Sequence, residues 1–263
     1  MELVLPKTYL TGYTSLNTEG LLEYLQDTKQ TEFLSEMEQA HKEGLSDGEI
    51  LCSFYAKLCY ASLVMGKNDN ITKIRSIHDN IIATVASGHG SVFEHCNLNF
   101  VVTNCSRVFT HELVRHRVGT AFSQTSGRYV RTDNVNLVYD SILDPAKERI
   151  TKLMKHIEQE YIGIKQDLGI ENIKDFATKK RLTSAMRRVL PNGQSNEIGF
   201  SLNLRALRHT IVMRTSEHAE WEIRVIFNQV YDLVKAKYPA LFADAEETIK
   251  NGIRQVTFRN AKI

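Results

Sequence analysis

The segment that most constrains this chain runs from Ser106 to Arg131 and reads SRVFTHELVRHRVGTAFSQTSGRYVR. It holds five arginines and two histidines against a single acid: Arg107, Arg115, Arg117, Arg128, Arg131, His111, His116 and Glu112. Helical spacing in the first half places Arg107, His111 and Arg115 on one face. From Val118 to Gly127 the residues are those of a polar loop. We therefore expect a cationic helix followed by a loop.

This arrangement is suited to binding phosphate. Guanidinium groups offer forked N–H donors, and small residues in a loop leave backbone N–H groups free for an anion. A solvated basic helix on the surface is the alternative interpretation. The chain has 33 basic and 31 acidic residues, a net charge of +2. Because a nucleic-acid lattice needs a broad basic surface, this balance indicates a small anion instead.

The remaining composition is that of a globular protein. With 263 residues, 42% of them hydrophobic and 24% charged, the chain can bury a core without covalent staples. It has no N-terminal apolar run of signal length, and no stretch of about 18 apolar residues that predicts a membrane span. The four cysteines have neither CxxC nor zinc-type spacing: Cys52, Cys59, Cys96 and Cys105. This predicts reduced thiols in a cytoplasmic protein that has no metal site.

Hydrophobic periodicity and turn residues predict strands interspersed with longer helices. Strands are expected at 3–14, 97–103, 135–139 and 198–202. Helices are expected at 18–44, 47–65, 71–86, 145–168, 171–189, 204–214 and 221–235. No repeat or linker divides the chain. The prediction is therefore one α+β domain, residues 1–263, with a small mixed or antiparallel sheet flanked by long helices.

Two further stretches carry side chains able to do chemistry. Residues 89–95, HGSVFEH, place two histidines, a serine and a carboxylate in a turn between a helix and a strand. Such turns often carry function, although an ordinary helix C-cap would also explain this one. Arg187 and Arg188 end a predicted helix, where the helix dipole alone would favour cations.

The predicted helix 204–214 presents cations in two directions. Asn203 is suited to cap its start. Arg205 and His209 share one face of the helix, whereas Arg214 lies nearly opposite. A single pocket in a monomer does not explain both faces easily, so this pattern favours a helix placed between subunits.

Together these motifs resemble the flavin-dependent thymidylate synthase family, also called thymidylate synthase-complementing proteins. Its signature is RHR, seven residues, Ser, any residue and Arg. In this chain Arg115-His116-Arg117 is followed by eight residues and then by Ser126-Gly127-Arg128. HGSVFEH, RRVLP at 187–191 and NLRALRHTIVMRTSEHAEW at 203–221 match the family in the same order. The extra residue falls near 119–122 and leaves open which loop residue meets which ligand atom.

The resemblance implies reductive methylation of dUMP to dTMP, with 5,10-methylenetetrahydrofolate as carbon donor, FAD as redox carrier and NADPH as reductant. The residues implied to bind dUMP are Glu112, Leu113, Val114, Arg115, Gln124, Thr125, Ser126, Gly127, Arg128, Arg187 and Arg214. Those implied to bind FAD are Ser91, Glu94, Arg115, His116, Arg117, Gln124, Asn203, Arg205 and His209. Catalytic roles fall to Arg214, which would stabilise an anionic uracil, and to His89, near the folate and the flavin.

The resemblance also implies a homotetramer whose active sites are shared between subunits, with small molecules as partners and neither nucleic acid nor membrane among them. The chemistry is consistent with the residues, because no cysteine is marked as a nucleophile and an arginine together with a flavin would have to activate the uracil. Two alternatives stay open. The same scaffold could act on another pyrimidine nucleotide or transfer a hydroxymethyl group, or the protein could be a non-catalytic nucleotide- or RNA-binding protein.

Overall fold

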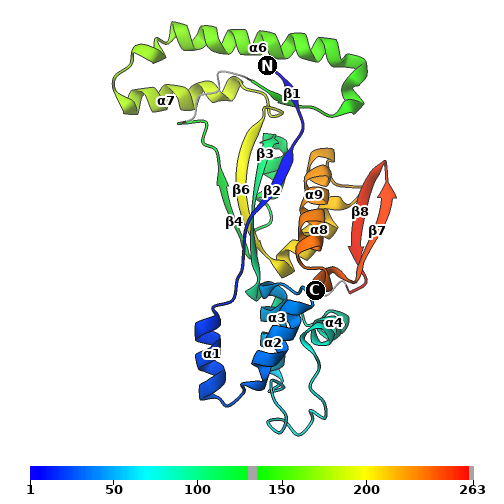
Figure 1. Cartoon of the computed structure of the whole chain (residues 1–263). Coiled ribbons are helices and arrows are strands. Elements are labelled where there is room, and N and C mark those ends of the chain that lie inside the picture. The colour runs from blue at the N-terminus through cyan, green and yellow to red at the C-terminus, as the bar shows by residue number, and fades with distance from the viewer. Residues whose placement is uncertain (130–134, 261–263) are drawn as a thin grey trace.

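A four-stranded antiparallel sheet forms the centre of the molecule (Figure 1). The computed structural model describes residues 1–129 and 135–260, so Arg131 of the cationic segment lies outside the described residues. The strands are β2 (Lys7–Tyr13), β3 (Asn97–Cys105), β6 (Asn196–Asn203) and β4 (Thr120–Gln124), in the order β2-β3-β6-β4. Each neighbouring pair is antiparallel. Together with its long helices, this sheet confirms the predicted α+β class.

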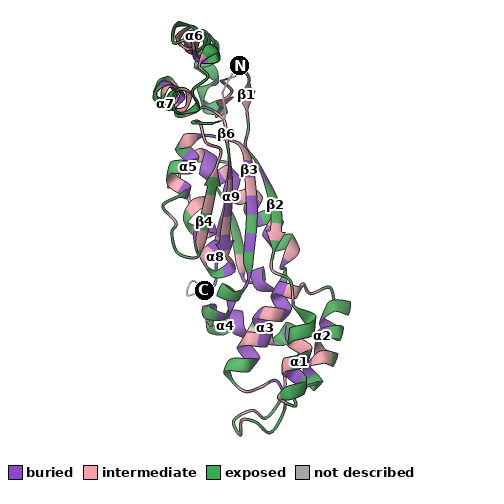
Figure 2. Ribbon diagram, turned by 90° about the vertical axis from the view of Figure 1, so that its left-hand side faces the viewer, coloured by how far each residue is buried: buried purple, intermediate pink, exposed green. Residues whose placement is uncertain are grey.

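Two helices, α8 (Leu204–Thr215) and α9 (Trp221–Lys237), cover one face of this sheet. Alternate residues of β3 and β6 are buried on that face, and Phe100 stacks on Phe200 with ring centroids 5.1 Å apart. Figure 2 shows the buried positions alternating along the strands and following the inner side of α9. Period-two alternation in the strands and the apolar stripe of α9 thus build one core.

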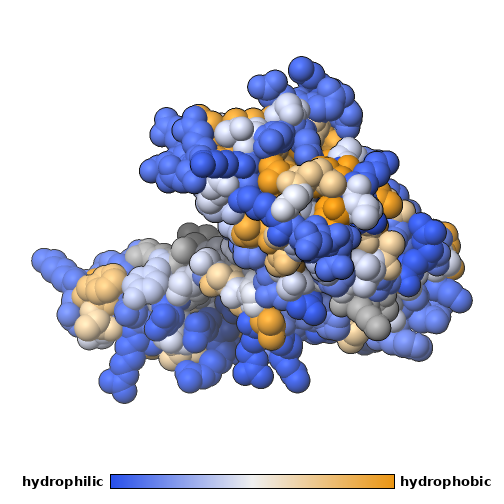
Figure 3. Space-filling view, turned by 90° about the horizontal axis from the view of Figure 1, so that it is seen from below, coloured by the Kyte–Doolittle hydropathy of each residue, from blue (hydrophilic) through white to orange (hydrophobic). Residues whose placement is uncertain are grey.

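Four helices lie together at the lower end of the molecule in Figure 1. They are α1 (Thr18–Asp27), α2 (Glu32–Lys42), α3 (Asp47–Cys59) and α4 (Ile77–Ser87). Seen from below, this end is mostly hydrophilic with small hydrophobic patches (Figure 3). Gly88 ends α4 in the left-handed conformation, with φ 75°, as the sequence predicts.

Three predicted helix boundaries in this region are wrong. The single helix expected at 18–44 is two helices, because Lys29 adopts φ 55° and turns the chain between them. The helix expected at 47–65 ends at Cys59, shortly before Ala61 takes φ 48°. The helix expected at 71–86 begins only after Ser76, whose side chain accepts a hydrogen bond from the backbone of Asp79.

A pair of helices forms an arm across the upper end of the molecule (Figure 1). Its elements are β1 (Leu3–Val4), β5 (Leu137–Val138), the 3₁₀ turn Ser141–Ala146, α6 (Lys147–Asp167), the 3₁₀ turn Ile170–Asn172, α7 (Phe176–Met186) and the 3₁₀ turn Arg187–Val189. A small cluster of Tyr161, Ile170 and Met186 joins the two helices. None of the helices in the described part of the chain is long and apolar enough to cross a bilayer.

The arm also differs from prediction in detail. The opening strand expected at 3–14 is split into β1 and β2, because Pro6 has no N–H to donate to a ladder. The strand expected at 135–139 is only the two residues of β5. The helix expected at 171–189 is interrupted, and Asp175 caps α7 by accepting a hydrogen bond from the backbone of Thr178 at 2.8 Å.

The chain ends in a hairpin that the sequence analysis did not predict. It follows the 3₁₀ turn Ala240–Phe242 and consists of β7 (Ala245–Lys250) and β8 (Ile253–Phe258), which packs on α8. Its turn is Asn251-Gly252, with φ 53° and 74°. These left-handed values are those of a type I′ turn, for which Asn-Gly is the preferred pair. The dipeptide was therefore a usable signal.

Candidate active site

The cationic segment begins with a helix shorter than expected, α5 (Arg107–Leu113). Ser106 caps it by accepting a hydrogen bond from the backbone of Phe109 at 3.2 Å. After Leu113, which is fully buried, the backbone continues in i to i−3 bonds, so Arg115 lies in a turn beyond the helix. The prediction that Arg115 shares a helical face with Arg107 is therefore wrong. The buried Leu113 side chain belongs to the core and faces no solvent.

The turn after α5 is joined to α8 by Arg214. Its Nε donates to Nε2 of His116 at 2.7 Å, one guanidinium nitrogen donates to Oε2 of Glu112 at 2.8 Å, and the other donates to the Glu112 carbonyl at 3.2 Å. We call these three residues the Arg214 clamp. An arginine has five N–H donors, so two remain for a ligand.

The clamp also fixes the protonation of His116. Burial, together with the positive charge of Arg214 and with His209, lowers the pKa of His116 to about 4. The imidazole is therefore neutral at physiological pH. Because arginine can only donate, Nε2 of His116 must accept, and the ring proton lies on Nδ1.

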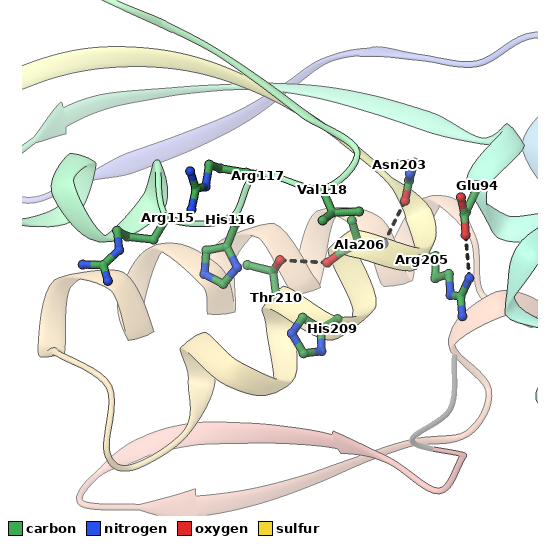
Figure 4. A pocket seen from close by; sticks show the side chains of 10 residues that line it. All are labelled: Glu94, Arg115, His116, Arg117, Val118, Asn203, Arg205, Ala206, His209 and Thr210. Carbon is green, nitrogen blue, oxygen red and sulfur yellow. Dashed lines mark hydrogen bonds and ion pairs between the residues drawn. The ribbon is translucent and has the colours of Figure 1, made fainter.

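A cavity of about 460 Å³ lies between this turn and α8 (Figure 4). Its lining residues are Glu94, Arg115, His116, Arg117, Val118, Asn203, Arg205, Ala206, His209 and Thr210. They include seven of the nine residues that the sequence associated with FAD. Figure 4 shows the segment 115–117 and the helix residues Arg205 and His209 around one space. Three arginines against one acid give this cavity a net positive charge, to which neutral His116 does not add.

Two contacts determine the far end of this cavity. Arg205 pairs with Glu94 of the 3₁₀ turn Gly90–His95 at 2.6 Å, which orients both side chains. Asn203 caps α8, as predicted, by accepting a hydrogen bond from the backbone of Ala206 at 2.8 Å. Gly119 lies against Asn203: its φ is 65°, and a Cβ there would lie 2.2 Å from Nδ2 of Asn203. Only glycine fits this position without displacing the cap.

The expected loop 118–127 contains the edge strand β4, so that prediction is wrong for residues 120–124. Pairing with β6 satisfies the backbone of β4, and its side chains alternate between half-buried and exposed. Gln124 therefore points inward and donates to Thr110 Oγ1 at 3.3 Å, outside the lining of the FAD cavity. The backbone of Thr125 bonds to the Glu197 carbonyl.

Beyond β4, a turn at Ser126 and Gly127 lies beside two arginines from other elements. A Cβ placed on Gly127 would lie 3.6 Å from a guanidinium nitrogen of Arg107 and 3.7 Å from Cδ of Arg187. Burial and the charge of Arg187 lower the pKa of Arg107. Two guanidiniums thus converge on a turn of small residues, next to the exposed Arg128. We call these residues the arginine turn.

Arg107 was not among the candidate site residues. The only signal in the sequence was its place at the start of the cationic helix, which dipole arguments would count as unfavourable for a cation. The fold brings it to the arginine turn because α5 starts next to the loop after α7: the backbone N–H of Arg107 donates to the carbonyl of Asn192 at 2.9 Å.

His89 and Ser91 line a second cavity, of about 330 Å³, between α3 and α4. The Tyr60 hydroxyl lies 2.9 Å from Nε2 of His89, and Arg75 also lines this space. The structure therefore separates these two residues from the seven that share the first cavity. In the single chain, Glu94 faces the first cavity and Ser91 the second.

Comparison with known proteins agrees with this geometry. The family model of the thymidylate synthase complementing protein matches residues 42–240, which include every candidate site residue. The chain belongs to this family. The match covers both cavities and the arginine turn, and leaves out β1, β2, α1, all but the last residue of α2, and the C-terminal hairpin.

Curated relatives in the family are flavin-dependent thymidylate synthases. That of Mycobacterium marinum is 32% identical over 236 residues, covering 83% of this chain and 88% of the relative. Those of Mycolicibacterium gilvum and Mycobacterium tuberculosis are each 31% identical over the same length, with the same coverage. Among solved structures, thymidylate synthase X from Helicobacter pylori, with FAD and dUMP, has a TM-score of 0.56 at 18% identity. It covers 91% of this chain and 98% of its own and shows that the fold is shared.

Proposed function

We propose that this protein is a flavin-dependent thymidylate synthase that methylates dUMP to dTMP. In this proposal 5,10-methylenetetrahydrofolate is the carbon donor and NADPH the reductant. Membership of the thymidylate synthase complementing protein family supports it, as do the names of the curated relatives. The observation that carries it is the Arg214 clamp, because it places a guanidinium with free donors between a cationic cavity and the arginine turn.

The first cavity has the chemistry that FAD requires. FAD carries a diphosphate, and Arg115, Arg117 and Arg205 line the space together with neutral His116 and polar Asn203. These residues would hold the cofactor. When bound, the flavin supplies the redox chemistry by which the transferred carbon reaches the methyl level. The ion pair of Arg205 with Glu94 would keep that arginine in place before the cofactor binds.

The arginine turn is the proposed site of the dUMP phosphate. Ser126, Gly127 and Arg128 would contribute with Arg187, and we add Arg107 because it lies beside Gly127. A dianionic phosphate takes bidentate hydrogen bonds from guanidinium groups. Burial and, to a smaller extent, the charge of Arg187 lower the pKa of Arg107, and a bound dianion would offset both effects.

Arg214 is the proposed stabiliser of the uracil. A preorganised guanidinium favours the ionised pyrimidine and so raises the nucleophilicity of C5. Glu112 and His116 would orient this group, since both accept hydrogen bonds from it. The described cysteines do not offer an alternative nucleophile in the first cavity: Cys52, Cys96 and Cys105 are buried, and Cys59 lines only the second.

His89 and Ser91 line the second cavity, and we propose that this space completes the active site only in an assembly. A homotetramer with shared sites is the assembly that we propose. The cations of α8 do not require it, because in one chain Arg205 and His209 line the first cavity and Arg214 binds Glu112 and His116. What supports it is the separation of His89 and Ser91 from the first cavity. We further propose that residues 1–263 act as one domain in the cytoplasm.

An omission assay tests the function. Purified protein is incubated with dUMP, labelled methylenetetrahydrofolate, FAD and NADPH, leaving out one component at a time, and the product mass is determined. The expected result is dTMP only when all are present. A hydroxymethylated product, or turnover of a different pyrimidine nucleotide, would show that the same scaffold performs another reaction. Absence of both flavin binding and turnover would refute the proposal.

A further inference from the structure

Glu222 is a buried carboxylate that binds the start of α5. It lies in the first turn of α9 and is 3% exposed. One carboxylate oxygen accepts from the backbone N–H of Ser106 at 2.6 Å, and the other accepts from the Ser106 hydroxyl. Ser106 is itself buried and caps α5 through Phe109. Glu222 therefore holds the residue from which α5 begins.

The carboxylate is not needed to cap its own helix. Glu220 already does this, accepting from the backbones of Glu222 and Ile223 at 2.8 and 3.3 Å. Burying an ionisable group is unfavourable unless its partners compensate for the lost hydration. Among the described residues, the contacts that compensate here come from Ser106. The interaction thus joins α9 to α5, two elements 116 positions apart in the chain.

Helix α5 carries a part of the proposed dUMP site at each end. Arg107 follows Ser106 directly and lies at the arginine turn. Glu112, near the other end, binds Arg214 through both its carboxylate and its carbonyl. The orientation of this seven-residue helix is set by the core packing of Phe109 and Leu113 and by how its ends are held.

We propose that Glu222 is a positioning residue for the nucleotide site: by binding Ser106 it fixes α5, and α5 fixes Arg107 and the Arg214 clamp. This inference rests on the proposed function, because it assigns Glu222 to the binding of dUMP. The Glu222 side chain lines neither cavity, and it contacts neither the arginine turn nor the Arg214 clamp directly.

The charges around Glu222 make this anchor sensitive to pH. Burial raises the pKa of Glu222 to about 7, the Ser106 hydrogen bonds oppose that rise, and Glu220 and Glu112 add to it. The Cys105 thiol of β3 is a further titratable neighbour, and two charged groups act one step away: Arg214 of α8 pairs with Glu112, and Asp140 acts on Glu220. A protonated carboxyl cannot accept both Ser106 hydrogen bonds. The anchor should therefore weaken as the pH falls below about 7.

The chain offers a matched control in Glu49. This carboxylate is fully buried in the first turn of α3, accepts from the backbone and hydroxyl of the cap residue Ser46 at 2.9 and 2.8 Å, and also binds the backbone of Ala240. Its chemistry matches that of Glu222, but it lies in the lower helices. Glu49→Gln therefore reports what loss of a buried, serine-capping carboxylate does to stability alone.

The test compares Glu222→Gln and Glu49→Gln in the FAD-loaded protein. We measure the dUMP Kd by calorimetry and kcat/KM for dUMP from pH 6 to 9, with Tm as the stability readout. Both variants should lower Tm. Only Glu222→Gln should weaken dUMP binding, roughly tenfold for one charged hydrogen bond, and should lose the step near pH 7 that we expect in the wild-type profile. If Glu222→Gln does not fold, Ser106→Ala, which removes one of the two bonds, should weaken dUMP binding by a smaller factor.

The outcomes separate the two hypotheses. Unchanged dUMP binding and an unchanged pH profile in the folded Glu222 or Ser106 variant would overturn the role of Glu222 and leave the function intact. Equal changes in Glu49→Gln would also overturn it, since the effect would then be one of general stability. Wild-type protein that binds no dUMP would refute the proposed function itself.

Discussion

Arg214 and His116 are joined by a hydrogen bond of 2.7 Å from Nε to Nε2. The bond links α8 to the turn that follows α5, and it forms only if His116 is the acceptor. The central histidine of the RHR segment is thus a fixed neutral group that helps to aim an arginine. A cluster of cations can hold this histidine without charging it because burial and, after it, the neighbouring guanidinium both oppose protonation and lower the pKa of His116.

Replacing Arg214 should separate chemistry from cofactor binding. Arg214→Ala removes the centre of the clamp but none of the lining of the first cavity. We expect FAD to remain bound, by its absorbance, while dTMP formation falls about 100- to 1000-fold. Arg254→Ala is the control. The Arg254 side chain, on β8 of the hairpin, is 25% exposed against 20% for Arg214, and it has its own carboxylate partner in Asp232 of α9. More than about a tenth of the wild-type rate in Arg214→Ala would remove the residue from its proposed role.

The arginine turn predicts an effect on substrate affinity. Arg107→Ala and Arg128→Ala should each raise the dUMP KM roughly 10- to 100-fold, the range for one lost charged hydrogen bond, with a smaller change in kcat. Steady-state kinetics with varied dUMP measures both. Arg188→Ala is the control, because Arg188 is exposed and adjacent in sequence to Arg187. A KM unchanged by Arg107→Ala would exclude that residue from the phosphate site.

Gly119 predicts a steric effect on FAD. In Gly119→Ala the new methyl group must displace Asn203, which caps α8 and lines the first cavity. We expect weaker FAD binding in a fluorescence titration, together with a lower Tm. Gly66→Ala carries similar backbone strain, with φ 85°, but meets nothing within 4 Å. It should lower Tm and leave FAD affinity unchanged. Equal FAD affinity in the two variants would contradict the role of the contact with Asn203.

His116 predicts part of the acid sensitivity of the fold. Its folded pKa of about 4 lies below the ordinary value of 6.5, so the unfolded chain binds more protons between these values. The stability contributed by neutral His116 is therefore complete above about pH 6.5 and is lost as the pH falls towards 4. His116→Asn should show a smaller loss of Tm between pH 7 and pH 5 than the wild type. An identical loss in both proteins would count against a buried, neutral His116.

Much of the fold was readable from local patterns. Strand β6 and residues 97–102 of β3 alternate because one face meets the core, and Ser106, Ser46 and Asn203 are caps with a recognisable residue type. The break at Lys29 was not readable, because a lysine in the left-handed conformation has no local signature and is held there by its surroundings. The edge strand β4 was missed for a related reason: only Thr120 and Phe122 of its five residues favour strands, the glycine, serine and glutamine around them indicate a loop, and pairing with β6 decides the conformation.

The candidate site was also predictable only in part. The sequence motifs correctly grouped seven residues that line one cavity. They could do so because each motif lies at the end of a strand or helix, and the central sheet brings these ends together. Helical angle alone could not predict which cations of α8 line the cavity and which are buried in the core. Arg208 is fully buried, pairs with Asp244 and lies 3.8 Å from the Phe258 ring centre, on a hairpin that was not predicted. The roles that we assign to Arg107 and Glu222 depend on contacts with residues distant in sequence, and no local sequence pattern predicts such contacts.

The shortness of α5 has a consequence for which nucleotides can be accepted. Its two functional residues, Arg107 and Glu112, are five positions apart, so with a rise of about 1.5 Å per residue their backbones lie about 7.5 Å apart along the helix axis. Because α5 is held at both ends, this spacing is fixed, and it selects nucleotides by the distance between their phosphate and their base. A monophosphate can reach both groups at once, whereas the terminal charge of a di- or triphosphate lies too far from its base. We therefore expect dUDP and dUTP to compete poorly with dUMP in a binding titration.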